Sequence, residues 1–154
     1  MKRISIGFLV TFMLLVIISA CKEDKWMDWK LANDQWYAIH KNDPGFITTS
    51  SGLCYKVIHQ GYQRRPNINS VVFVKYKGSL IDGSVFQVVD TTTAVVSLAT
   101  AILGWQEGIQ KMNGGGSYDF YIPSKLGYDT ISTNLTIPPH SVLIFHVDLI
   151  DSQY

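Results

Sequence analysis

The sequence AILGWQEGI occupies residues 101–109 and is followed by FYIP at 120–123, LGY at 126–128, IPPH at 137–140 and LIF at 143–145. These segments supply aromatic and aliphatic side chains but almost no acid, base or nucleophile. A site built from them would bind an apolar group by shape and by exclusion of water. The series therefore predicts an apolar cavity. This prediction restricts the range of possible functions more than any other part of the chain does.

The overall composition is that of one globular domain. The chain has 154 residues, and 47% of them are hydrophobic, which is enough to build a real core. Its net charge is +1, and there is no basic stripe, so nucleic acid is excluded as a partner. The histidines do not have the spacing of metal ligands. We expect neither a metal nor a cofactor.

Residues 1–20 predict a lipoprotein signal peptide. Lys2 and Arg3 precede an apolar segment at 4–18, and small residues lead to Cys21. Cys21 would become the lipidated first residue of the mature chain, where each buried CH₂ of an acyl chain contributes about 0.8 kcal/mol. We therefore expect a protein of the bacterial cell envelope, lipid-anchored in the outer membrane and facing either the periplasm or the surface. The alternative is an uncleaved membrane anchor, although the segment is short for a spanning helix of roughly 20 residues.

A helix is predicted over residues 24–40, where apolar side chains recur at helical spacing. The stripe consists of Trp26, Trp29, Ala32, Trp36 and Ile39, and the sequence NDPG at 42–45 ends the helix. We expect the stripe to dock against the rest of the chain, with a membrane or partner contact as the alternative. Residues 21–45 would then form a lipidated N-terminus with an amphipathic helix, ahead of a domain at 46–154.

The remaining pattern is that of an α+β domain. Alternating apolar residues predict strands at 53–57, 72–76, 84–86, 95–98, 118–122 and 143–149, with a hairpin turn at Asp82-Gly83, a loop over 87–95 and a short helix at 104–112. We expect a curled antiparallel β-sheet wrapped over the short central helix. Cys54 falls in the first strand and is expected to be a small packed residue.

From about residue 51 to 151 the chain resembles the FKBP-type peptidyl-prolyl cis-trans isomerases. The matching segments are SGLCY at 51–55, VKYKG at 74–78, DGSVF at 82–86, ILGW at 102–105, IPP at 137–139 and LIF at 143–145. The resemblance implies an FKBP-like isomerase domain over 46–154. Together with Cys21 and the extra helix, it makes the chain similar to lipoproteins of Bacteroidota. The sequence KED at 22–24 resembles their surface-export signal, and the alternative is a solvated linker or the acidic first turn of a helix.

The resemblance also implies a site. Its catalytic residues would be Tyr76, Phe86, Trp105, Tyr128 and Phe145, and its substrate-binding residues Gln87, Ala101, Ile102 and Ile137. The Trp105 ring would form the floor under a proline ring. The backbone N–H of Ile102 and the hydroxyl of Tyr128 would donate hydrogen bonds to substrate carbonyls, and residues 130–136 would form a flap. The partners implied are proline-containing polypeptides, with macrolide-type ligands as a further candidate class.

The implied chemistry agrees with an apolar cavity. An X–Pro bond isomerises by rotation through a twisted amide against a barrier of about 18–20 kcal/mol, and this rotation needs no nucleophile. The twisted amide is less polar than the planar one, so an apolar pocket favours it. The expected function is peptidyl-prolyl isomerisation that assists the folding of exported proteins. The alternative is an FKBP-like peptide-binding or chaperone module with little or no turnover.

Four positions depart from the family pattern. Asp129 replaces a usual glycine beside Tyr128, and Thr136 replaces an aliphatic residue of the expected flap. Gln87 stands where most active members carry an aspartate, so we expect reduced activity. Ala94 stands where an aromatic residue is usual, which would widen the pocket.

Overall fold

The computed structural model describes residues 26–131 and 136–154. The predicted signal peptide, Cys21 and the segment 22–24 lie outside the described residues and stay predictions. Within the described part of the chain, no helix is both long and apolar enough to cross a membrane.

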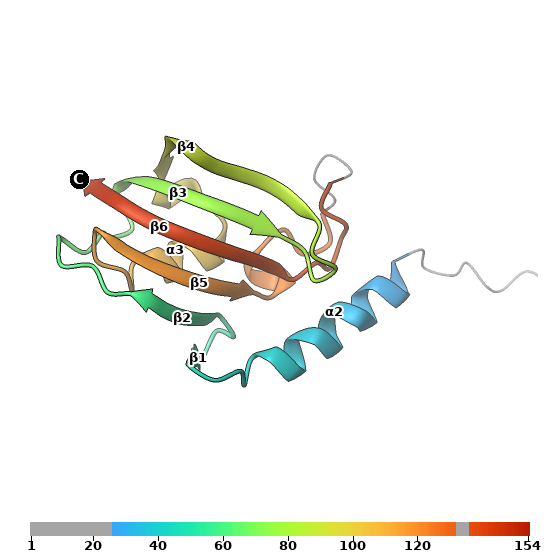
Figure 1. Cartoon of the computed structure of the whole chain (residues 1–154). Helices are drawn as coiled ribbons and strands as arrows, with labels where there is room; N and C mark the ends of the chain where they lie inside the picture. Colours follow the sequence, from blue (N-terminus) through green and yellow to red (C-terminus); the bar gives the residue numbers. More distant parts are fainter. Residues whose placement is uncertain (1–25, 132–135) are drawn as a thin grey trace, which may run out of the picture.

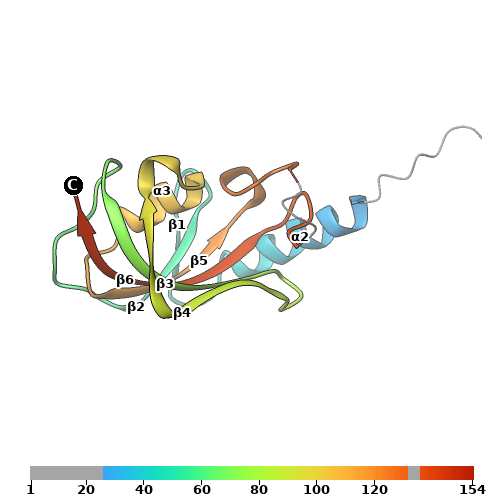
Figure 2. The ribbon, with the colours of Figure 1, turned by 90° about the horizontal axis from the view of Figure 1, so that it is seen from above.

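One antiparallel sheet of six strands forms the body of the protein, in the order β1-β2-β5-β6-β3-β4. Figure 1 shows its strands, which are β1 Phe46–Thr48, β2 Cys54–His59, β3 Val71–Ser79, β4 Val85–Ser97, β5 Gly116–Ile122 and β6 Leu143–Gln153. The helix α3, Leu103–Ile109, lies against one face of the curled sheet (Figure 2). The helix α2, Met27–His40, runs beside the sheet. Short 3₁₀ turns occupy Leu98–Thr100 and Ser124–Leu126. The predicted α+β fold, with its extra N-terminal helix, is confirmed.

The core forms between the sheet and α3 because alternate residues of the central strands point to the same face. In β5, Tyr118, Phe120 and Ile122 are at most 3% exposed. In β6, the buried set is Leu143, Phe145, Val147 and Leu149. Both alternations were predicted from the sequence, and both are confirmed.

Two glycines let α3 approach the sheet closely. A Cβ atom at Gly104 would lie 2.5 Å from Ile122 Cγ2, and one at Gly108 would lie 2.6 Å from Phe120 Cε1. A side chain at either position would push the helix away from β5. This close approach fixes the helix and thereby sets the position of Trp105, which is only 6% exposed.

The helix α2 docks on the domain through side-chain hydrogen bonds. Trp29 Nε1 donates to Ser141 Oγ over 3.0 Å, and the backbone N–H of Val142 donates to Asn33 Oδ1 over 2.8 Å. The Tyr37 hydroxyl donates to the carbonyl of Gly52. The expected docking is therefore confirmed, and the helix ends at His40 as predicted.

The predicted docking stripe was wrong in two members. Ala32 is exposed and Ile39 is 67% exposed, whereas Asn33 is fully buried. The polar Asn33 can be buried because its amide also donates to the carbonyl of Trp29 over 2.8 Å, so both ends of the amide have partners.

Asn33→Ala should lower the free energy of unfolding by about 1–3 kcal/mol, since it leaves the buried N–H of Val142 without an acceptor. Urea denaturation measures this. Asp34→Ala is the matched control, because its ion pair with Lys30 is on the surface and should contribute at most about 0.5 kcal/mol. Equal losses in the two variants would contradict the role of Asn33.

Three further elements differ from the sequence prediction. The expected loop over 87–95 is part of one continuous strand, β4. Its pairing with β3 shifts from Tyr76↔Val89 to Val74↔Ala94, so residues 90–93 form a bulge within the strand. The central helix ends at Ile109 rather than 112, and the three-residue strand β1 was not predicted.

Candidate functional site

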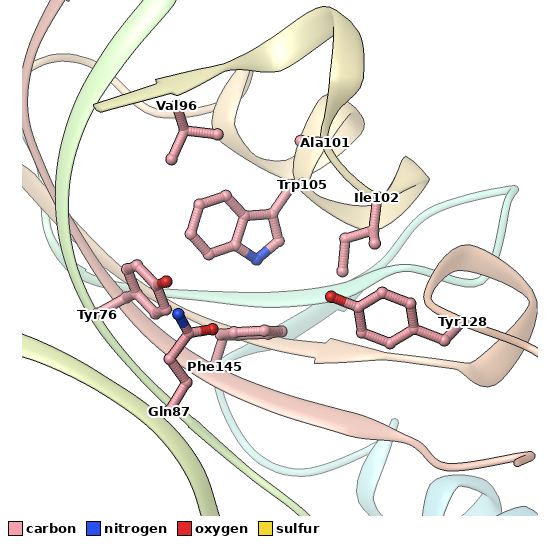
Figure 3. A pocket seen from close by; sticks show the side chains of 8 residues that line it. All are labelled: Tyr76, Gln87, Val96, Ala101, Ile102, Trp105, Tyr128 and Phe145. Atoms are coloured by element: carbon pink, nitrogen blue, oxygen red, sulfur yellow. The ribbon is translucent and has the colours of Figure 1, made fainter. Parts of the chain in front are cut away.

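A cavity of about 150 Å³ opens between α3 and the sheet. Figure 3 shows the side chains around it, which are those of Tyr76, Gln87, Val96, Ala101, Ile102, Trp105, Tyr128 and Phe145. None of these side chains is an acid, a lysine, an arginine or a histidine. The cavity therefore offers apolar surface and a few uncharged polar atoms.

Each wall of the cavity comes from a different element. Tyr76 lies on β3, Phe145 on β6, and Trp105 on α3. The Trp105 ring is edge-to-face with Tyr76, at 5.0 Å between centroids, and with Phe145, at 5.3 Å. Such contacts stabilise a fixed aromatic arrangement beyond the area that they bury. The three rings form a rigid concave surface.

Polar atoms enter this surface at a few points. The indole Nε1 of Trp105 is buried and has no hydrogen-bond partner among the described residues, and it faces the cavity in Figure 3. The Tyr128 hydroxyl and the Gln87 amide also point toward the cavity. Gln87 is exposed on β4, at the mouth. A bound group with carbonyl oxygens would meet donors here.

The Tyr76 hydroxyl keeps its proton at neutral pH. Burial raises the pKa of Tyr76, and the neighbouring Tyr128 raises it further. Burial is also the main cause that raises the pKa of Tyr37, Tyr118 and Tyr121. These hydroxyls therefore act as neutral hydrogen-bonding groups.

The raised pKa values predict loss of stability in alkali. Tyrosines of the unfolded chain ionise at about pH 10, where the folded protein still holds these protons, so the unfolded state binds fewer protons and stability falls as pH rises through this range. Urea denaturation at pH 7 and at about pH 10.5 should show the fall. Tyr76→Phe should reduce it, and Tyr62→Phe, at a side chain 87% exposed, should leave it unchanged. Stability that is flat or rising above pH 10 would contradict the assignment.

Seven of the nine residues expected in the site line the cavity, namely Tyr76, Gln87, Ala101, Ile102, Trp105, Tyr128 and Phe145. Phe86 does not line it, but packs edge-to-face on Phe145 at 5.5 Å between centroids. Ile137 is 5% exposed and belongs to the core. The expected flap at 130–136 includes residues 132–135, which lie outside the described residues.

Val96 was not expected in the site. Ala94, which the family pattern places at the pocket, is partly buried against the core and pairs with Val74, while Val96 lines the cavity instead. Alternation would have placed both residues on one face of a strand, but the segment had been expected to include a loop. Across 26–131 and 136–154, no group of three or more His, Cys, Asp or Glu residues could hold a metal ion.

The fold and the cavity together define a class of proteins in which a curled antiparallel sheet closes an uncharged aromatic pocket against a short helix. Sequence comparison identifies the family within this class. Residues 62–150 match the model of the FKBP-type peptidyl-prolyl cis-trans isomerases, and the chain belongs to that family.

Two similar proteins come from bacteria. A probable FKBP-type peptidyl-prolyl cis-trans isomerase FkpA of Neisseria meningitidis is 41% identical over 108 residues, which are 69% of this chain and 40% of that protein. The outer membrane protein MIP of Legionella longbeachae is 34% identical over 123 residues, or 79% of this chain and 53% of that protein. The chain thus spans about half the length, or less, of these relatives.

Solved structures agree with this assignment. The crystal structure of FkpA from Escherichia coli matches with a TM-score of 0.79 and 30% identity, over 99% of this chain and 75% of that one. A peptidyl-prolyl cis-trans isomerase from Pseudomonas syringae also matches with a TM-score of 0.79, at 26% identity, over 87% of this chain and all of that one.

Proposed function

We propose that the protein is a peptidyl-prolyl cis-trans isomerase that assists the folding of exported proteins. The observation that carries this proposal is the uncharged aromatic cavity, which lies within a chain of the isomerase family. Its volume of about 150 Å³ suits a single ring such as that of proline.

The cavity would act by favouring the twisted amide. The planar X–Pro amide is polar because of resonance, and an apolar surface of Trp105, Tyr76 and Phe145 disfavours it relative to the twisted form. Only such a difference between ground state and transition state accelerates the reaction. Uncatalysed isomerisation takes tens to hundreds of seconds.

Two groups would hold the substrate backbone while the bond rotates. Ile102 is the N-cap of α3, and the first N–H groups of a helix have no acceptor within the helix. Its N–H and the Tyr128 hydroxyl would donate to carbonyls on either side of the proline. Fixing both ends of the bond reduces the motion that the reaction needs.

The second candidate function is an FKBP-like peptide-binding or chaperone module with little turnover. The observation that favours it is Gln87, whose amide replaces the usual carboxylate at the mouth of the cavity. An amide oxygen accepts hydrogen bonds more weakly than a carboxylate. NMR exchange spectroscopy on an X–Pro peptide, with no protease present, separates the two functions, because only an isomerase accelerates cis–trans exchange.

Gln87→Asp should raise kcat/KM by about fivefold, since a charge-assisted hydrogen bond is about 1 kcal/mol stronger than a neutral one. The same exchange assay measures it. Gln87→Asn is the matched control, because it shortens the side chain equally without adding charge. Turnover that is lower in the aspartate variant than in the parent would contradict this role for position 87.

The protein would work in the cell envelope, held by lipid on Cys21. Support comes from the sequence around Cys21, and from a relative whose name places it in the outer membrane. Cys21→Ala should move the protein from the membrane fraction to the soluble fraction, and globomycin should block processing of the parent. A variant that stays with the membrane would contradict lipid anchoring. Protease treatment of intact cells distinguishes a surface location from a periplasmic one.

A further inference from the structure

The two edges of the sheet are built differently. The edge strand β1 has three residues and follows directly after α2. The other edge strand, β4, has 13 residues, and within the described residues it pairs only with β3. In Figure 1 it is the outermost strand, and no residue of it is buried. One side of the backbone is therefore open along its two regular parts, 85–89 and 94–97, over roughly 15 Å each.

Apart from its bulge, β4 carries little protection against pairing. Proteins usually blunt an open edge with a bulge, lysine, proline or a very short strand, and of these β4 has only the bulge at 90–93. In β4, VFQVVDTTTAVVS, eight of the 13 residues are valine or threonine, and none is lysine, arginine or proline. Its single charge is Asp90, in the bulge. Val88 and Val95 expose 49% and 63% of their surface. Such a strand is prone to pair with another extended chain.

The open edge is continuous with the cavity. Gln87 and Val96, on the two sides of the bulge, both line the cavity from β4. Figure 3 shows the Gln87 side chain reaching from the strand into the site. A polypeptide with a proline in the cavity therefore has β4 within reach of the residues that flank the proline.

We propose that β4 binds the substrate by strand addition: an extended, uncharged segment beside the proline pairs with its open backbone. This inference rests on the proposed function and names its substrate class, unfolded chains rich in β-branched residues around a proline. Main-chain hydrogen bonds would supply binding that is tolerant of sequence, while the cavity selects the proline. Because β4 carries a single charge, it attracts neither acidic nor basic segments strongly. An uncharged segment pays the smallest desolvation cost when it binds.

The test uses uncharged ten-residue peptides with one central proline and valine or threonine on both sides. A strand that pairs on one edge uses alternate N–H groups. Two versions of the peptide are therefore N-methylated at alternate positions, in opposite registers. We expect one register to lose affinity by about tenfold and the other to bind like the parent peptide. A tetrapeptide that fills only the cavity is the control, and methylation outside its proline should have little effect.

Amide hydrogen exchange supplies the second measurement, on the full chain. The β4 amides that do not bond to β3 should exchange more slowly when the long peptide is bound, and not with the tetrapeptide. If Trp105 fluorescence reports an occupied cavity while β4 exchange and both methylated peptides are unchanged, strand addition is overturned and the proposed function stands. If no peptide alters either signal, both fail. A dimer that protects β4 without peptide would identify a second copy as the occupant and also overturn the proposal.

Discussion

Trp105→Ala is expected to lower the free energy of unfolding by about 3–5 kcal/mol, the usual range for removing a large aromatic side chain from a core. Trp105 is 6% exposed and contacts both Tyr76 and Phe145. The same change removes the floor of the cavity, so affinity for proline peptides should fall together with stability. Urea denaturation measures the first effect, and peptide titration at low temperature, where the variant is still folded, measures the second.

Trp36→Ala is the matched control for this variant. Trp36 is half-buried on α2 and packs on Tyr121 at 4.9 Å between centroids, away from the cavity. Its replacement should cost less stability and leave peptide affinity unchanged. Equal losses of affinity in the two variants would show that binding follows stability in general and would count against Trp105 as the floor.

Phe120→Ala should also lower the free energy of unfolding by about 3–5 kcal/mol, because Phe120 is the largest fully buried side chain and fills the space under α3. Gly108→Ala alone should cost about 1–3 kcal/mol, since its Cβ would lie 2.6 Å from Phe120. In the double variant the new methyl group enters the space that the ring left. The double variant should therefore lose less free energy of unfolding than the sum of the two single losses. Urea denaturation of all three variants measures this.

Additive losses would contradict the close approach of α3 to β5 at Gly108. Phe46→Ala is a suitable control for the ring itself, because Phe46 is half-buried and stacks on Tyr121 at the sheet edge. It should combine additively with Gly108→Ala, since the two positions do not touch.

The regular elements of the fold could be predicted because their side chains alternate strictly. The inner faces of β5 and β6 follow a period of two, which is visible in the sequence of both strands. The docking stripe of α2 was less accurate, because hydrophobicity favoured Ala32 and Ile39. The buried residue is Asn33, whose Oδ1 accepts a hydrogen bond from the N–H of Val142, which is distant in the sequence. Such long-range partners leave no local signal.

The strand β4 shows a second limit. Its bulge at 90–93 carries Asp-Thr-Thr-Thr, which reads as a break between two strands, yet threonine is well suited to extended backbone. The strand continues because β3 supplies partners on both sides of the bulge. After the bulge the pairing with β3 is regular, and Val96 lines the cavity while Ala94, on the same face of the strand, packs against the core.

Most of the candidate site came from resemblance to a family rather than from periodicity. Aromatic residues such as Trp105 and Phe145 would be expected in a core, and only the order of the motifs suggested a cavity. The structure brings them together with Gln87 and Tyr128, whose polar ends point inward. Phe86 supports Phe145 from outside the cavity, a difference that depends on packing and could not be read from spacing.

The central claim, that the cavity accelerates rotation about X–Pro bonds, is tested most directly by NMR exchange spectroscopy on a proline peptide with no protease present. We expect cis–trans exchange clearly faster than the uncatalysed process, which takes tens to hundreds of seconds, and a much smaller acceleration with folded Trp105→Ala protein. Exchange no faster than the uncatalysed rate, with the peptide bound in the cavity, would contradict isomerase function and leave the protein as a binding module.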